Sequence, residues 1–322
     1  MTFDSNVLPD DLIQRLQDKD AVVRRVAVRE LTDSISPDAL PWLLGALQDE
    51  DTAVRQEAAL LLDEFDLESA ADSLVTALTH GDSAVREAAG RALADVKDPA
   101  LVPALLAALK SDDAFVLASV LNALKQFRDA RSKDQALALL AHADPQVRRN
   151  AVVVLGYLGD TTTQANLSQR IFNDSDSEVR RSAVGAIQFG DPDVVGPWLI
   201  DTLRDEHWQV RAEAAKGLGR LRVHSARTAL ITVLQDEAWQ VVEQAVLALG
   251  ALGQTEAIAA VGSALEHPVA NVRKAVVSAL GEIGHVDAIS FLQIALDDPD
   301  PDVRKISRWA LHQVSTHVSK HQ

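Results

Sequence analysis

The sequence contains no cysteine, and only 4% of its 322 residues are aromatic. The lack of cysteine excludes disulfides, thiolate metal sites and cysteine nucleophiles. The aromatic content is too low for the core of a typical compact domain, so alanine, leucine and valine must do the packing. These side chains suit closely packed pairs of helices.

Basic charge is also scarce, with 31 Lys and Arg against 47 Asp and Glu and a net charge of -16. Such a chain repels a phosphate backbone or an anionic bilayer, so we expect no nucleic acid and no membrane as partner. Residues 1–5 contain no basic segment followed by an apolar run, and no stretch approaches the roughly 20 apolar residues of a membrane span. The sequence therefore predicts a soluble cytoplasmic protein.

A repeat of 31 residues, with one interval of 32, runs through the chain. It is found by aligning the dipeptide Val-Arg, whose second position we call the anchor. The anchors are Arg24, Arg55, Arg86, Leu117, Arg148, Arg180, Arg211, Val242, Arg273 and Arg304. A large apolar residue stands eight residues before every anchor, and a Leu or Ile stands seven residues after it. This spacing predicts helical hairpins whose second helix carries the anchor.

Each predicted hairpin has an acidic turn, and several end in glycine. The Asp four residues before an anchor is placed to cap the second helix, and its carboxylate to face the Arg of the neighbouring repeat in a ladder of charges. In the segment Leu249-Gly250-Ala251-Leu252-Gly253, the earlier glycine permits close packing and the later one ends the helix.

The pattern Asp-x-x-x-Val-Arg-x-x-Ala-x-x-x-Leu-Gly-x-Leu-Gly resembles HEAT repeats, specifically the HEAT-like repeats named after phycobilisome (PBS) lyases. This resemblance implies an all-α fold, a right-handed α-solenoid of about ten two-helix repeats forming one unit over residues 1–322. The approximate repeats are 8–36, 37–68, 69–98, 99–130, 131–161, 162–193, 194–224, 225–255, 256–286 and 287–317, before a polar tail at 318–322. The family includes scaffolds, bilin lyases, a di-iron hydroxylase and DNA glycosylases, so the site must decide the function.

Function is expected where one repeat departs from the others at an exposed position. Two consecutive repeats carry Trp three residues before the anchor, and tryptophan is frequent at binding hot spots. The alternative is that both rings only cover the turn. The second of these repeats has also lost its anchor Arg, which forms a less charged pocket if the second helix lines the concave face, as the resemblance implies. We predict a partner-binding surface made of Trp208, Trp239, His207, Gln240, Glu243 and Leu247.

Two further features are candidates for binding. Phe115 and Leu117 form an apolar break in the fourth repeat, although Phe115 turning inwards is the alternative. Arg149 and Arg181 each follow an anchor Arg and are either contacts for an acidic partner or part of a solvated face. The acidic turns give a negative rim, which attracts a protein partner with a basic surface unless it serves only for capping.

Tests for enzymatic chemistry are negative. The His-Glu dipeptides of the di-iron family members are absent from the second helices, and no phosphate loop or nucleophile elbow occurs. We expect no catalytic residue, no metal and no cofactor, and predict a non-catalytic protein-binding scaffold or assembly factor. The alternative that the resemblance implies is a bilin lyase or chromophore-handling chaperone. In that case the Trp pair and His207 stack on a tetrapyrrole, and Arg149 or Arg181 meets its propionates.

Overall fold

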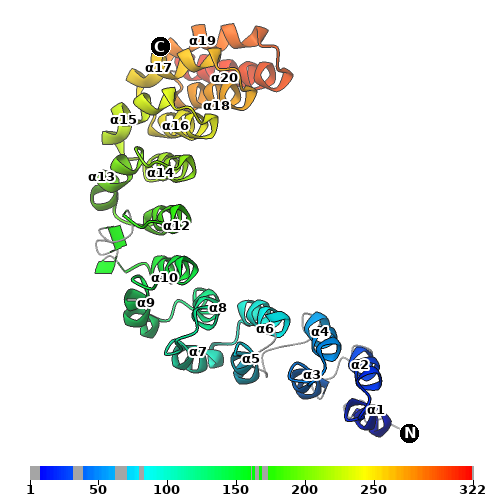
Figure 1. Ribbon diagram of the computed structural model, residues 1–322. Coiled ribbons are helices and arrows are strands. Elements are labelled where there is room, and N and C mark those ends of the chain that lie inside the picture. The colour runs from blue at the N-terminus through cyan, green and yellow to red at the C-terminus, as the bar shows by residue number, and fades with distance from the viewer. Residues whose placement is uncertain are drawn as a thin grey trace. The chain divides into compact units, whose positions relative to one another are not determined.

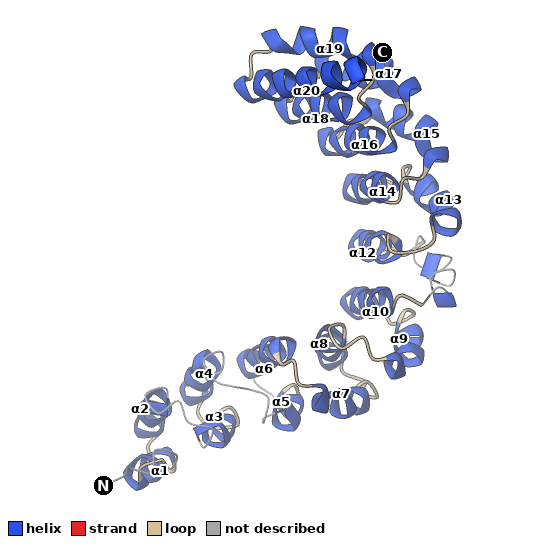
Figure 2. Ribbon diagram, turned by 180° about the vertical axis from the view of Figure 1, so that it is seen from behind, coloured by secondary structure: helices blue, strands red, loops and turns tan. Residues whose placement is uncertain are grey.

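The computed structural model describes residues 8–31, 39–61, 71–79, 83–160, 162–163, 167–168 and 173–320. Within these residues the chain is helical and contains no strand (Figure 2). The chain divides into two compact units, Met1–Leu158 and Gly159–Gln322, each built of helical hairpins (Figure 1). This is the all-α solenoid architecture that the repeat predicts.

In the first unit, the helices alternate between the first and the second helix of a hairpin. The first helices are α1 (Asp10–Leu16), α3 (Leu40–Ala46), α5 (Ala71–Ala77), α7 (Val102–Ala108) and α9 (Lys133–Leu139). The second helices are α2 (Ala21–Glu30), α4 (Thr52–Leu61), α6 (Ser83–Asp95), α8 (Ala114–Leu124) and α10 (Pro145–Leu158). Short 3-10 turns, η5 (Pro99–Leu101) and η6 (Ala130–Ser132), precede α7 and α9.

The second unit follows the same scheme. Its first helices include α13 (Pro192–Thr202), α15 (Arg227–Thr232), α17 (Ile258–Ser263) and α19 (Ile289–Ile294). Its second helices are α12 (Ser177–Ile187), α14 (Trp208–Arg220), α16 (Trp239–Leu252), α18 (Ala270–Ile283) and α20 (Pro301–Lys320). The 3-10 turns are η7 (His224–Ala226), η8 (Val233–Gln235), η9 (Thr255–Ala257), η10 (Ala264–Glu266), η11 (Val286–Ala288) and η12 (Ala295–Asp297).

The core of each unit comes from the two apolar positions of the repeat. Seven residues after the anchor, Leu218, Leu249 and Leu280 are fully buried, and eight residues before it Leu203 and Leu234 are buried as well. Successive second helices pack on one another, as α14 does on α16 and α16 on α18. The predicted packing stripes are therefore confirmed at these positions, because each of these helices covers the apolar face of the next.

Where the residue four positions before the anchor is a described Asp, it caps the second helix as predicted. The carboxylate four residues before the anchor accepts the backbone N–H two residues further on, at distances of 2.7 to 2.9 Å. These caps are Asp20, Asp51, Asp113, Asp144, Asp176 and Asp300. One such cap typically stabilises a helix by about 1 kcal/mol. At the other end, Gly253 and Gly284 terminate α16 and α18 with φ values of 65° and 69°, in the left-handed region that favours glycine.

The anchor arginines join consecutive hairpins. Nη1 of Arg211 donates to the carbonyl oxygens of Asp205 and Glu206 in its own turn, while Nε and Nη2 donate to both carboxylate oxygens of Asp236 in the next turn. The guanidinium therefore holds two turns at once. The same bidentate pairs, at 2.7 to 3.0 Å, are Arg24 with Asp49, Arg180 with Asp205, Arg211 with Asp236 and Arg273 with Asp298.

The partner in these pairs differs from the one predicted. In all four, the Arg is bound by the Asp six residues before the next anchor, not by the capping Asp four residues before it. Arg86 pairs instead with a capping residue, Asp113, because the place six residues before Leu117 is taken by Ser111. The charge ladder exists, but in these four pairs a second carboxylate of the turn provides it.

None of the helices in the described part of the chain combines the length and the apolar character needed to cross a lipid bilayer.

Candidate functional site

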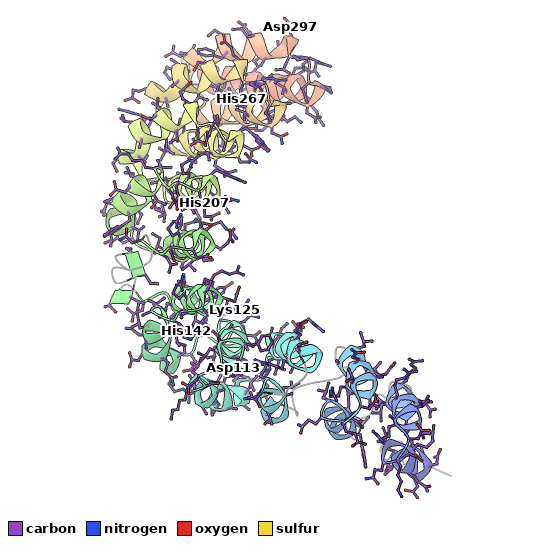
Figure 3. All side chains as sticks on the ribbon, viewed as in Figure 1. Asp113, Lys125, His142, His207, His267 and Asp297 are labelled. Carbon is purple, nitrogen blue, oxygen red and sulfur yellow. The ribbon has the colours of Figure 1, made fainter. Side chains whose placement is uncertain are left out.

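The two anchors that lack Arg are core positions. Leu117 is 2% exposed and Val242 is 1% exposed, so neither side chain is displayed to a partner. The prediction that Leu117 belongs to a binding surface is therefore wrong, because the anchor side chain points between hairpins. In the following turns, His142 and His267 replace the ladder Asp, and their Nδ1 atoms accept the backbone N–H groups of Asp144 and Val269 (Figure 3). A carboxylate there would lack its guanidinium and be costly to bury.

The two equivalent tryptophans have different environments. Both are the first residue of a helix, and the preceding residues, His207 and Ala238, make no side-chain cap (Figure 3 labels His207). Trp208 is 38% exposed, whereas Trp239 is half-buried and packs against the apolar core of the second unit. Trp208 thus presents apolar area to solvent, while Trp239 has a packing role in the structure.

Two residues of α16 predicted to bind a partner line one hollow. Glu243 and Leu247 form one wall of a groove of ≈ 210 Å³, and the other wall comes from α18. Leu247 is 37% exposed, and Gln240 lies one turn before Glu243 on the same helix and is half-buried. The Glu243 carboxylate accepts no hydrogen bond and forms no ion pair with any residue that the structure describes. Lys274, on the facing wall, forms ion pairs with Asp300 and Asp302 instead.

Burial in this groove raises the pKa of Glu243 above its usual value. A carboxyl whose pKa is raised on folding favours the folded state at low pH, and that contribution is lost as the pH rises through the folded-state pKa. We therefore expect Glu243→Gln to raise the unfolding temperature at about pH 7 and to change it much less at about pH 4, near the reference pKa of glutamate. Thermal unfolding at both pH values measures the difference.

Glu282→Gln, on the exposed surface of α18, is the matched control for this substitution. It changes the same net charge without removing a carboxylate from a groove. An equal rise for both variants would show that net charge, and not the burial of Glu243, sets the effect.

A larger groove, of ≈ 600 Å³, runs over α6, α8 and α10. Phe115 of α8 and Arg149 of α10, which the sequence singled out separately, both line it. Phe115 is half-buried, and the guanidinium carbon of Arg86 lies 4.7 Å from the centre of its ring. Arg149 is also half-buried and has no partner among the residues that the structure describes. The structure therefore brings two predicted binding residues of adjacent repeats to one place.

Several residues of this groove were not anticipated from the sequence. Asn150 donates from Nδ2 to the carbonyl oxygen of Ala118 at 2.7 Å and accepts from Gln146 at 3.0 Å. Gly90 lies within α6, although glycine is unfavourable inside a helix. A glycine within a predicted helix is the sequence feature that could have indicated the groove. A Cβ at Gly90 would lie 3.1 Å from Oγ of Ser119, so α6 and α8 approach closely at this point.

Arg181 is engaged within its own helix. Its Nη2 donates to Oε2 of Glu178 at 2.6 Å, three residues earlier in α12. Such exposed pairs contribute about 0–1 kcal/mol, so Arg181 fits the solvated face that was the alternative for it. Nowhere in the described residues do three His, Asp or Glu side chains gather closely enough to hold a metal ion.

Comparison with known proteins identifies the family. The model for HEAT repeats matches residues 9–94, 71–141, 134–196, 196–261 and 230–312, which is nearly the whole chain. The chain belongs to the HEAT-repeat family. No curated protein matches this HEAT-repeat sequence.

Solved structures show the same fold. A chain from the structure of Kap95p with RanGDP has a TM-score of 0.61 and 15% identity, over 95% of this HEAT-repeat chain and 48% of its own length. An engineered protein has a TM-score of 0.53 and 21% identity, over 95% and 98% of the two chains. YibA of Escherichia coli has a TM-score of 0.53 and 18% identity, over 93% and 99%. At these identities the similarity concerns the fold alone.

Proposed function

We propose that this HEAT-repeat chain is a non-catalytic protein-binding scaffold that uses the second helices of its C-terminal unit. One observation carries the proposal: the α16–α18 groove combines an exposed Leu247 with a Glu243 carboxylate that no described residue satisfies. The side chains at the repeated anchor and leucine positions pack neighbouring hairpins together, whereas Glu243 and Leu247 have no such packing role. A half-buried carboxylate without a donor favours a partner that supplies one.

The partner that fits this groove has a basic or hydrogen-bond-donating group for Glu243 and an apolar side chain for Leu247. Trp208, at the start of the neighbouring helix α14, adds apolar area of the kind found at binding hot spots. The net charge of -16 speeds encounter with a basic partner. The fold similarity to the Kap95p structure, in which Kap95p binds RanGDP, supports a protein as the partner.

Two finer points belong to the same proposal. We propose that the repeats are of the phycobilisome-lyase-like type, which the Asp-x-x-x-Val-Arg pattern supports, and that the protein works in the cytoplasm. Tetrapyrrole handling, the alternative from that resemblance, gains no observation in the described residues, since Trp239 packs on the core and Arg181 binds Glu178.

Quantitative capture from a lysate of the native host tests the proposal. We expect the combined variant Trp208→Ala, Leu247→Ser to lose specific partners by roughly fivefold or more, because tryptophan is frequent at binding hot spots and Leu247 adds apolar contact area. Leu60→Ser is the matched control, since Leu60 occupies the same repeat position in α4 and is 71% exposed. Equal capture by both variants contradicts the proposed surface. Trp239 is left unchanged, because its truncation would disturb the core.

A further inference from the structure

The α6–α8–α10 groove has a preformed aromatic wall. Nη2 of Arg86 donates to both carboxylate oxygens of Asp113, at 2.8 and 2.9 Å, and Asp113 in turn caps α8 (Figure 3). The same guanidinium lies over the ring of Phe115. A Cβ at Gly90 would lie 3.5 Å from Cζ of that ring. Because the guanidinium of Arg86 lies against one face of the ring and Gly90 lies near its tip, the ring has less freedom left to lose when a ligand binds.

The charges of this groove are unevenly distributed. On the α10 side, the residues that line the groove are Arg149, Gln146 and Asn150, and none of them is acidic. The side-chain amides of Gln146 and Asn150 form a hydrogen bond with each other. On the α6 side, Arg91 lies between Glu87 and Asp95. The α10 side is therefore basic and the α6 side is net acidic. A polyanion such as a nucleic acid would meet repulsion along half of the groove.

Small and polar side chains separate the aromatic wall from the basic one. Ala118 and Ser119 of α8 form this part of the groove, and Oδ1 of Asn122 accepts a hydrogen bond from Lys125 at 2.7 Å. Neighbouring helices pack about 8–10 Å apart, and an extended chain advances about 3.3 Å per residue. A ligand that contacts both α8 and α10 thus needs two side chains about three residues apart.

We propose that this groove binds a short extended peptide that places a carboxylate on Arg149 and, about three residues away, an aromatic side chain on Phe115. The carboxylate and the guanidinium form a charge-assisted hydrogen bond, and the two rings stack. This site is separate from the α16–α18 groove and has the opposite charge preference. The peptide-binding proposal therefore does not depend on the proposed function, and each is tested separately.

The test uses the full-length chain and labelled synthetic peptides of about ten residues, with Asp and Phe three positions apart in a Gly-Ser background. Fluorescence anisotropy measures their affinity. We expect Arg149→Gln to weaken binding roughly tenfold, as for the loss of a hydrogen bond to a charged group. Arg25→Gln is the matched control because Arg25 also follows an anchor, and it should leave the affinity unchanged. A peptide with Lys in place of Asp should not bind.

The aromatic half of the site has its own control. Phe115→Ala should weaken binding of the same peptide, whereas Phe189→Ala should not, although the ring of Phe189 also lies under an arginine, Arg220, at 4.1 Å. Arg149→Gln does not touch the core, so loss of binding at an unchanged unfolding temperature reports the site and not the fold. The proposal is overturned if the Lys-Phe peptide binds as tightly, if Arg149→Gln has no effect, or if only a single-stranded oligonucleotide binds.

Discussion

Replacing Arg211 with valine is expected to lower the free energy of unfolding by about 3–5 kcal/mol, the usual effect of removing one partner of a buried ion pair. The side chains of Arg211 and Asp236 are 11% and 9% exposed. Valine would leave the Asp236 carboxylate without its bidentate donor and remove the donor to the carbonyl oxygens of Asp205 and Glu206. Urea-induced unfolding followed by circular dichroism measures the loss, and hydrogen exchange locates it in α14 and α16.

The chain itself provides the control for this substitution. Where the anchor is Val242, the ladder position of the next turn is His267 and not Asp. The double variant Arg211→Val, Asp236→His copies that arrangement and should recover at least about half of the lost stability, since the two sites are directly coupled. A single variant as stable as the wild type contradicts a stabilising ladder. A double variant that is no more stable than the single one contradicts the compensation.

The fold could be predicted from the sequence because each repeat contacts mainly its neighbours. The same local requirements recur every 31 residues, so Leu249 and Leu280 follow the same rule as Leu218 and are buried in the same way. Helix caps are also local, because a carboxylate such as Asp300 binds backbone atoms two residues away. Periodicity therefore specifies both the hairpin and its stacking.

The candidate sites were harder to predict, because they depend on contacts between repeats. The missing anchor Arg at Leu117 suggested an exposed apolar patch, but Leu117 is buried. The anchor position faces the next hairpin, and an arginine there, such as Arg211, extends to a carboxylate of the next turn. The signal that could have shown this is His142, which replaces the partner carboxylate. The meeting of Phe115 with Arg149 in one groove depends on the packing of α8 against α10, which single-repeat patterns do not describe.

Gly250→Ala is expected to destabilise the protein by about 1–3 kcal/mol, the range for overpacking a well-packed core. Helix propensity alone predicts the opposite sign, because alanine is better than glycine in a helix by about 1 kcal/mol. A Cβ at Gly250 would lie 2.7 Å from Cβ and 2.8 Å from Cα of Ala279. The second of these atoms is backbone of α18, so the clash is relieved only by moving one helix away from the other. A Cβ added at Gly219 would likewise lie 2.7 Å from Cα of Ala248.

Gly185→Ala is the matched control, since Gly185 lies within α12 and an added Cβ would meet nothing within 4 Å. There the propensity gain is unopposed, so stability should rise by up to about 1 kcal/mol. Urea-induced unfolding of both variants therefore gives shifts of opposite sign for the same chemical change. If both alanines shift the free energy of unfolding in the same direction, the close approach of α16 and α18 does not explain why residue 250 is glycine.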